Sequence, residues 1–183
     1  TIKNNDEESV WNLTTGRQAI VENARKAADM GVDMIVLTGN PEVGVDNEAI
    51  MQALSELKDA VGDRVILTAG KMHASGIVSE TGEKILTEKD IVDFIDAGAD
   101  VILLPTPGIT MEYASKLIKK AHEKGALTMT TIGTSQEGAD EDTIRQIALM
   151  CKMAGADIHH IGDSGYMGMA LPENITAYSV AIR

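Results

Sequence analysis

Short apolar runs alternate with longer stretches of helical periodicity along almost the whole chain. Three of the runs follow a glycine, a small residue and an aspartate, and two looser copies follow a glycine. Successive runs start about thirty residues apart, which is the length of one strand plus one helix. The pattern therefore predicts five repeats of a strand followed by a helix. The runs occupy residues 33–37, 64–67, 100–104, 127–130 and 157–161.

Each run is rich in aliphatic and β-branched residues and lacks strict alternation, as is typical of a parallel strand covered on both faces. The stretches between the runs carry apolar stripes of helical period. Capping patterns that start at Thr15, Asp46 and Thr87 precede the first three of them. The glycine that precedes each apolar run is placed to end the helix before it in the left-handed conformation. The predicted helices are residues 17–30, 46–61, 87–95, 110–124, 140–154 and 172–182.

Repeated strand–helix units build either of two α/β architectures. The first is a parallel (β/α) barrel of the TIM type, incomplete here, with five βα units and a leading helix. The second is a five-stranded doubly wound open sheet. The similarity of the units favours the barrel, because edge and central strands of an open sheet lie in different surroundings. We expect residues 1–183 to form one barrel-like domain that lacks the first strands of a complete barrel.

One connection departs from the repeat. Residues 71–87 show no helical period, and residues 77–86 within them are typical of two short strands around a Thr81-Gly82 turn. The sequence therefore predicts a hairpin-like insertion after the second strand. It is either a lid or rim over a binding site or an addition without a function.

Composition narrows the functions that the chain can serve. It has 183 residues and a formal net charge of −12, which opposes non-specific binding to nucleic acid or to an anionic membrane surface. No apolar run is long enough to cross a bilayer, and the first residues carry no signal-peptide pattern. The single cysteine, Cys151, excludes an internal disulfide and a zinc site built on cysteines. We expect a soluble, cytoplasmic protein, and association into a homo-oligomer is left open.

Polar residues follow each predicted strand at the end where both candidate folds bind their ligands. Asn40, Lys71, Thr134 and Asp163 come directly after glycines, and we expect them to face one another across a common rim. The hydroxyl of Thr106 is a further candidate for contact with a substrate. We expect these residues to line one binding site.

Lys71 is the sharpest candidate for catalysis. A lysine at this position can act as a base, form a Schiff base with a carbonyl compound, or hold a carboxylate or phosphate. His73 is placed to serve as its acid–base partner. The alternative is a solvated loop lysine without a catalytic role.

Two adjacent histidines lie inside the last predicted strand. Alternation sends one of His159 and His160 toward the inner face of the sheet and the other toward the helices, so at most one can join the site. Strict alternation counted back from Asp163 favours His159. The alternative for each is a hydrogen-bonded structural histidine.

The loops after the last two strands have the composition of anion-binding loops. Their glycines expose backbone N–H groups and their hydroxyls add donors, as in the phosphate sites of barrels. Two carboxylates among these donors would repel an anion unless a divalent cation such as Mg²⁺ lay between, which makes Asp163 and Glu137 candidate metal ligands. The predicted substrate-binding residues are Asn40, Thr106, Gly133, Thr134, Ser135, Ser164 and Gly165.

The motifs at the strand ends together resemble an uncharacterised bacterial (β/α)-barrel family whose members are often labelled haloacid-dehalogenase-like hydrolases. The resemblance implies a barrel of which this chain is the C-terminal part, and it implies no established reaction. Dehalogenase chemistry of that type needs an Asp-x-Asp-x-Thr/Val string, which the chain lacks, so its motifs do not support the label. The residues that carry the resemblance are 38–41, 70–73, 106–108, 132–138 and 159–166.

We draw one leading hypothesis from these residues. The chain is an enzyme of lyase, aldolase or isomerase type that acts on a small phosphorylated or carboxylated metabolite, with Lys71, His73 and Asp163 as its catalytic residues. The alternatives are a binding or sensor module for the same small anions, which has no need of Lys71 or Asp163, and an uncharacterised hydrolase.

Overall fold

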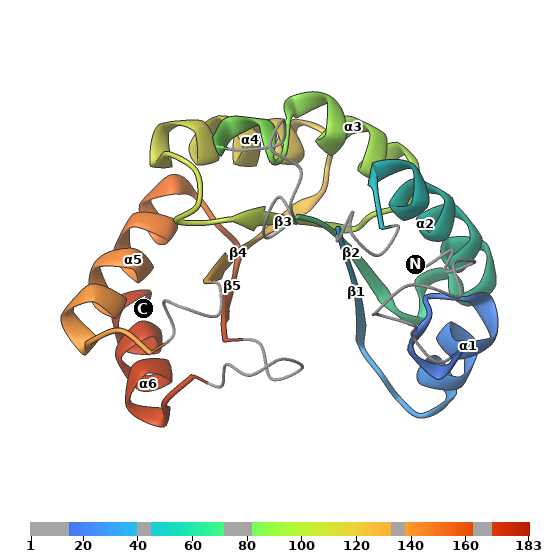
Figure 1. Ribbon diagram of the computed structural model, residues 1–183, viewed down its shortest axis with the longest axis horizontal. Coiled ribbons are helices and arrows are strands. Elements are labelled where there is room, and N and C mark those ends of the chain that lie inside the picture. Colours follow the sequence, from blue (N-terminus) through green and yellow to red (C-terminus); the bar gives the residue numbers. More distant parts are fainter. Residues whose placement is uncertain (1–14, 40–44, 72–81, 133–137, 163–169) are drawn as a thin grey trace, which may run out of the picture.

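The computed structural model describes residues 15–39, 45–71, 82–132, 138–162 and 170–183. Five parallel strands pair in the order of the sequence and curl into a half-barrel (Figure 1). The alternation of strand and helix therefore extends over the whole described chain. The strands are β1 (Met34–Thr38), β2 (Ile66–Gly70), β3 (Val101–Pro105), β4 (Leu127–Ile132) and β5 (Ile158–Ile161).

All the described α-helices lie on the convex side of the sheet (Figure 1). This arrangement and the consecutive strand order confirm the TIM-barrel-like prediction. The doubly wound alternative is wrong, because such a sheet carries helices on both faces and reverses its strand order. The helices are α1 (Val21–Asp29), α2 (Asn47–Val61), α3 (Glu88–Asp96), α4 (Met111–Glu123), α5 (Glu141–Ala154) and α6 (Pro172–Ala181).

Local capping explains where most of these helices begin. Asp46, Thr87, Thr110 and Asp140 each accept a hydrogen bond from a backbone N–H in the first turn, and Thr87 forms the predicted capping box with Asp90. The box predicted at Thr15 is wrong. Residues 15–17 form a 3-10 turn, and α1 begins only at Val21, after an N-cap residue that makes no side-chain hydrogen bond.

The two faces of the sheet differ in what covers them. Leu67 and Ile102 point outward into the main core, where they pack with the helices against residues such as Leu54 and Phe94. On the inner face, Val101, Leu103 and Met129 form a small apolar cluster, with Met34 and Ile158 packed beside it. The outer face thus carries most of the buried apolar surface, which is the main source of stability.

The predicted hairpin falls largely outside the described residues, since the structure describes none of residues 72–81. Its second half is described, and it is no strand: Gly82–Lys84 form a 3-10 turn, and Ile85 and Leu86 are consecutive buried residues. Two neighbouring buried side chains do not fit a strand with one exposed face. The segment instead closes over the core before α3 begins.

The aspartate of the motif formed by a glycine, a small residue and an aspartate has a structural role at the start of the strand. Asp100 accepts a hydrogen bond of 2.9 Å from the backbone N–H of Leu67, the first outward-facing residue of β2. Asp157 accepts one of 2.8 Å from the N–H of Thr128 in β4 and another of 2.8 Å from the hydroxyl of Thr128. Each carboxylate therefore fixes the preceding strand against its own.

A polar cluster connects β5 with the helix layer. His159 Nδ1 lies 3.0 Å from the hydroxyl of Tyr178 in α6 and 3.3 Å from that of Thr130 in β4. Burial lowers the pKa of His159, and the positive charge of Lys152 adds to this effect. Burial also raises the pKa of Tyr178, with a smaller contribution from Cys151. Both rings are therefore held in their neutral forms.

Among the described residues, no helix combines the length and the apolar character needed to cross a membrane.

We predict that Asp157→Ala lowers the free energy of unfolding by about 1–3 kcal/mol, because it leaves the N–H and hydroxyl of Thr128 without their acceptor. Asp63→Ala is the matched control, since the Asp63 side chain is fully exposed and its removal should cost less than about 0.5 kcal/mol. Urea denaturation followed by circular dichroism measures both. Equal losses in the two variants would contradict the role given to Asp157.

The same interaction predicts an acid-sensitive part of the stability. Burial raises the pKa of Asp157, but hydrogen bonds from His122 and Thr128 outweigh it and leave the pKa below its ordinary value. The carboxylate therefore stabilises the fold above its unfolded pKa of about 3.9, and this contribution disappears as pH falls through the lower folded value. The stability difference between the parent and Asp157→Ala should therefore shrink in acid.

We predict a second pH dependence of the stability, which arises from the buried His159. Because burial lowers its folded pKa, the unfolded chain binds a proton more tightly, and stability should fall as pH drops below about 6.5. His159→Gln should flatten this part of the curve. Urea midpoints between pH 8 and pH 5.5 test the prediction, and an unchanged slope in the variant would refute it.

Candidate active site at the carboxyl ends of the strands

The predicted site residues divide into two groups. Lys71 and Thr106 lie within the described residues, directly after β2 and β3. The other positions lie outside the described residues, so their proposed roles and the common rim stay predictions. They are Asn40, His73, Gly133, Thr134, Ser135, Glu137, Asp163, Ser164 and Gly165.

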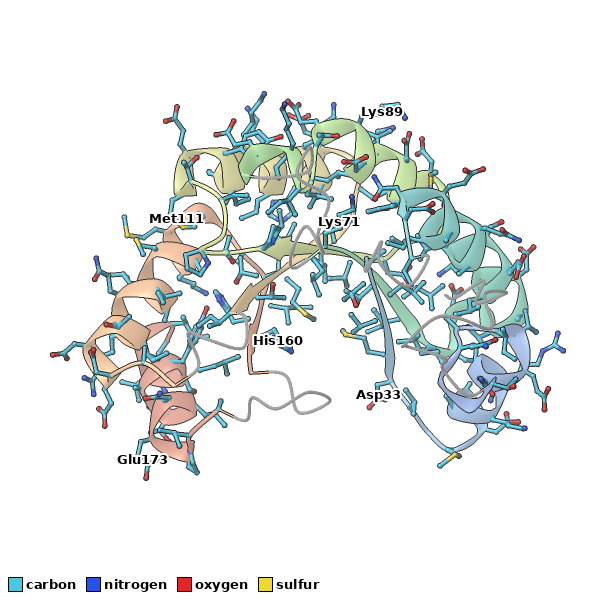
Figure 2. All side chains as sticks on the ribbon, in the orientation of Figure 1. Asp33, Lys71, Lys89, Met111, His160 and Glu173 are labelled. Atoms are coloured by element: carbon cyan, nitrogen blue, oxygen red, sulfur yellow. The ribbon has the colours of Figure 1, made fainter. Side chains whose placement is uncertain are left out.

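Lys71 is buried, with only 1% of its surface exposed. It continues the alternation of Leu67 and Ala69, which both face the helix layer. Figure 2 accordingly draws Lys71 on the helix side of the sheet and His160 on the inner side. A fully buried lysine is rare and needs an interaction partner, and Lys71 is engaged within the protein. Lys71 and His160 therefore lie on opposite faces of the sheet.

Two glycines make room for this arrangement. The N–H of Gly39 donates to the carbonyl of Gly70 at 3.0 Å, which places Gly39 opposite Lys71. A Cβ at position 39 would lie 2.9 Å from Lys71 Cγ, and one at position 70 would lie 2.0 Å from the carbonyl oxygen of Leu103. Gly70 thus permits the close approach of β2 and β3, and Gly39 leaves space for the stem of Lys71. Both glycines therefore have a packing role at the carboxyl ends of the strands.

Thr106 is also buried, with 1% of its surface exposed. Its hydroxyl accepts a hydrogen bond of 3.7 Å from the thiol of Cys151 in α5, on the helix side of the sheet. The following peptide bond to Pro107 is cis. Contact between Thr106 and a substrate in the interior stays a prediction, and it would require the hydroxyl to turn away from Cys151.

The inner face carries polar residues that the sequence reasoning missed. His160 faces the interior (Figure 2), since its neighbour His159 contacts α6. The preference for His159 as the inner histidine is therefore wrong, because the count back from Asp163 ran through Gly162, which does not continue the strand. Thr38, Thr68 and Thr131 share the inner face. Alternation from Leu67 and Ala69 would have identified Thr68, and the strand pairing places Thr38 and Thr131 on the same face.

The polarity of the interior changes along the strands. Near the carboxyl ends, Thr131 lies opposite His160, and its hydroxyl donates to the carbonyl of Leu104 at 2.9 Å. Near the amino ends the inner residues are apolar and include Met34, Ile66 and Leu127. Within the described residues, no group of three or more His, Cys, Asp or Glu could hold a metal ion. The predicted Mg²⁺ ligands Asp163 and Glu137 lie outside these residues, so that site stays a prediction.

Comparison with solved structures shows the fold. The chain is similar to a provisionally assigned deoxyribose-phosphate aldolase from Coccidioides immitis, with a TM-score of 0.65 and 16% identity over 94% of this chain and 63% of that one. It is also similar to a protein described as QR15, an aldolase, with a TM-score of 0.58 and 12% identity over 88% of this chain and 67% of that one. The chain thus spans less than two thirds of the first protein.

Comparison at the level of sequence gives the family. No curated protein matches the chain. One family model matches it over residues 1–183, and its description is "Domain of unknown function (DUF7916)". The chain therefore belongs to the DUF7916 family.

Proposed function

We propose that this protein is an enzyme of lyase, aldolase or isomerase type that acts on a small phosphorylated or carboxylated metabolite. The single observation that carries the proposal is the burial of Lys71 at the carboxyl end of β2. Ligands of (β/α) barrels bind at this end of the strands. The two similar barrels are described as aldolases, which fits the proposed class of reaction.

The packing of Lys71 suits an amine that reacts with a carbonyl compound. Its stem lies against the backbone of Gly39, so the amine is held at a fixed place instead of moving in solvent. Holding a nucleophile in position and out of bulk water removes part of the entropic barrier to its reaction. In the proposed reaction, the Lys71 amine leaves its buried place on the helix side and turns toward the mouth of the barrel. There it attacks the carbonyl carbon of the substrate, and the loss of water gives a Schiff base.

The remaining roles follow the sequence hypothesis. His73 would exchange the proton, and Asp163 would position a proton or, with Glu137, a divalent cation. The loops after β4 and β5 would bind the anionic group of the substrate through Thr134, Ser135 and other donors. These assignments rest on residue type and position along the strands.

We predict that sodium borohydride traps a covalent adduct on Lys71 when the protein is incubated with pyruvate or with glyceraldehyde 3-phosphate. Reduction of the Schiff base makes the adduct permanent, and peptide mass spectrometry locates it. Lys71→Met should abolish trapping. Lys89→Met is the matched control and should leave trapping unchanged, because Lys89 lies on the outer surface of α3.

The trapping experiment separates catalysis from a structural role. A lysine that only stabilises the fold would change the urea midpoint on substitution, yet it would form no adduct in the parent protein. Binding of both probes without an adduct would favour the sensor module over the enzyme. An adduct spread over the exposed lysines and absent from Lys71 would refute the proposal.

We also predict that Gly39→Ala slows the trapping of Lys71 while the fold is retained. The added methyl group would lie 2.9 Å from Lys71 Cγ, so the side chain must move. Gly16→Ala is the control, because no atom outside its neighbours lies within 4 Å of the new Cβ. Circular dichroism confirms folding, and equal trapping rates in both variants would contradict the positioning role of Gly39.

A further inference from the structure

His160 is the one titratable side chain that the five described strands direct to their inner face. The other inner side chains of these strands are aliphatic residues, methionines, threonines and a proline, together with a glycine. An imidazole gains or loses a proton near neutral pH, whereas none of these other side chains does so. A proton that the inner face of the described strands gives to a ligand therefore has to come from His160.

The inward direction of His160 is fixed by its neighbour. His159 Nδ1 lies 3.0 Å from the hydroxyl of Tyr178 and 3.3 Å from that of Thr130, and its ring packs against the Tyr178 ring with the centroids 5.5 Å apart. Because consecutive side chains of a strand point to opposite faces, this contact on the helix side directs His160 to the inner side (Figure 2).

His160 lies at the level of the strands where Lys71 lies. The pairing of the strands places Gly70 level with Ile158, and Lys71 is thus level with His159. His160 is one residue further along, which is a rise of about 3.3 Å. Both side chains therefore start at the carboxyl ends of the strands.

The curvature of the sheet brings β2 and β5 toward each other on the inner side. Three strand spacings of about 4.8 Å separate β2 from β5 along the sheet. The sheet curls toward its inner face, so the direct path across that face is shorter (Figure 1). Two long side chains that extend from Lys71 and His160 into the mouth can therefore approach one small molecule from two sides.

Thr131 provides a polar neighbour for the His160 ring. It lies directly opposite His160 in the strand pair, and its hydroxyl donates to the carbonyl of Leu104 at 2.9 Å. The proton of this hydroxyl is thereby used, and its oxygen can still accept a hydrogen bond. Thr131 is therefore suited to accept an N–H from the imidazole and to hold the orientation of the ring.

We propose that His160 is a catalytic acid, which protonates the hydroxyl group that leaves when the Schiff base on Lys71 forms. The inference rests on the proposed function, because this hydroxyl belongs to the adduct of the Lys71 amine. Exchange of the substrate's own proton stays with His73.

The proposed step is a dehydration. The Lys71 nitrogen adds to the carbonyl carbon, and the carbonyl oxygen becomes the hydroxyl of a carbinolamine. The imidazolium of His160 gives its proton to this hydroxyl, the C–O bond breaks, and water leaves. The lone pair of the nitrogen completes the C=N bond, and His160 is left neutral.

Chemical rescue tests this role. The protein is mixed with pyruvate or glyceraldehyde 3-phosphate for timed intervals and quenched with sodium borohydride, and mass spectrometry measures the adduct on Lys71. We expect His160→Ala to form it about 100-fold more slowly than the parent. Free imidazole should restore the rate, because it can enter the space of the lost ring and donate the proton.

Two controls separate proton transfer from packing. The first is 1,2,4-triazole, which has the shape of imidazole and is a much weaker base, so it should not restore the rate. The second is His122→Ala, since His122 lies in the last turn of α4, away from the carboxyl ends of the strands. This variant should form the adduct at the parent rate, with or without imidazole.

The outcomes distinguish the inference from the function on which it rests. A parent chain without an adduct on Lys71 refutes the proposed function, and the inference fails with it. An adduct that forms as fast in His160→Ala as in the parent overturns the inference alone. So does a slow His160→Ala variant that imidazole does not rescue or that triazole rescues equally. Rescue of His73→Ala and not of His160→Ala would assign the proton to His73.

A measurement on the parent chain decides the matter if His160→Ala does not fold. The chain has four histidines, so their ring signals can be assigned in a nuclear magnetic resonance spectrum with four His→Gln variants. We expect pyruvate to shift the ring signal of His160 and to leave that of His122 in place. An unchanged His160 signal in a chain whose Lys71 forms the adduct would overturn the inference.

Discussion

The register of two strand pairs, β2 with β3 and β4 with β5, depends on a hydrogen bond between an aspartate at the start of one strand and the backbone of the strand before it. Parallel strands can slide along one another, and a slip of one residue exchanges the inner and outer faces. Asp100 and Asp157 oppose that slip, because each binds the N–H of the residue directly opposite it. Basic residues from the helix layer bind the same carboxylates, so strands and helices are fixed together.

Much of the fold was predictable because it is encoded locally. Capping at Asp46 and Thr87 marks where helices begin, and the spacing of glycine and aspartate sets the repeat. The start of α1 was missed because the Thr15 pattern caps no α-helix, and the buried pair Ile85 and Leu86 was mistaken for strand because both are aliphatic. Propensity gives no information about which tertiary surface covers such residues.

The site was predictable only in outline. Sequence position gives the end of the sheet at which Lys71 lies, but its burial depends on its neighbour across the sheet, Gly39, which is more than thirty residues away. The choice between His159 and His160 likewise depends on where β5 ends, and one residue of error reverses it. Pairing partners and strand ends are properties of the folded chain. The motifs therefore identified the residues but not the face of the sheet to which each side chain points.

Asp33 and Lys71 lie at opposite ends of the strands. Asp33 lies before the first residue of β1, and Lys71 and Gly39 lie beyond the last residues of β2 and β1. Five residues of strand span roughly 17 Å, so a change at Asp33 is too far from Lys71 to alter its packing directly.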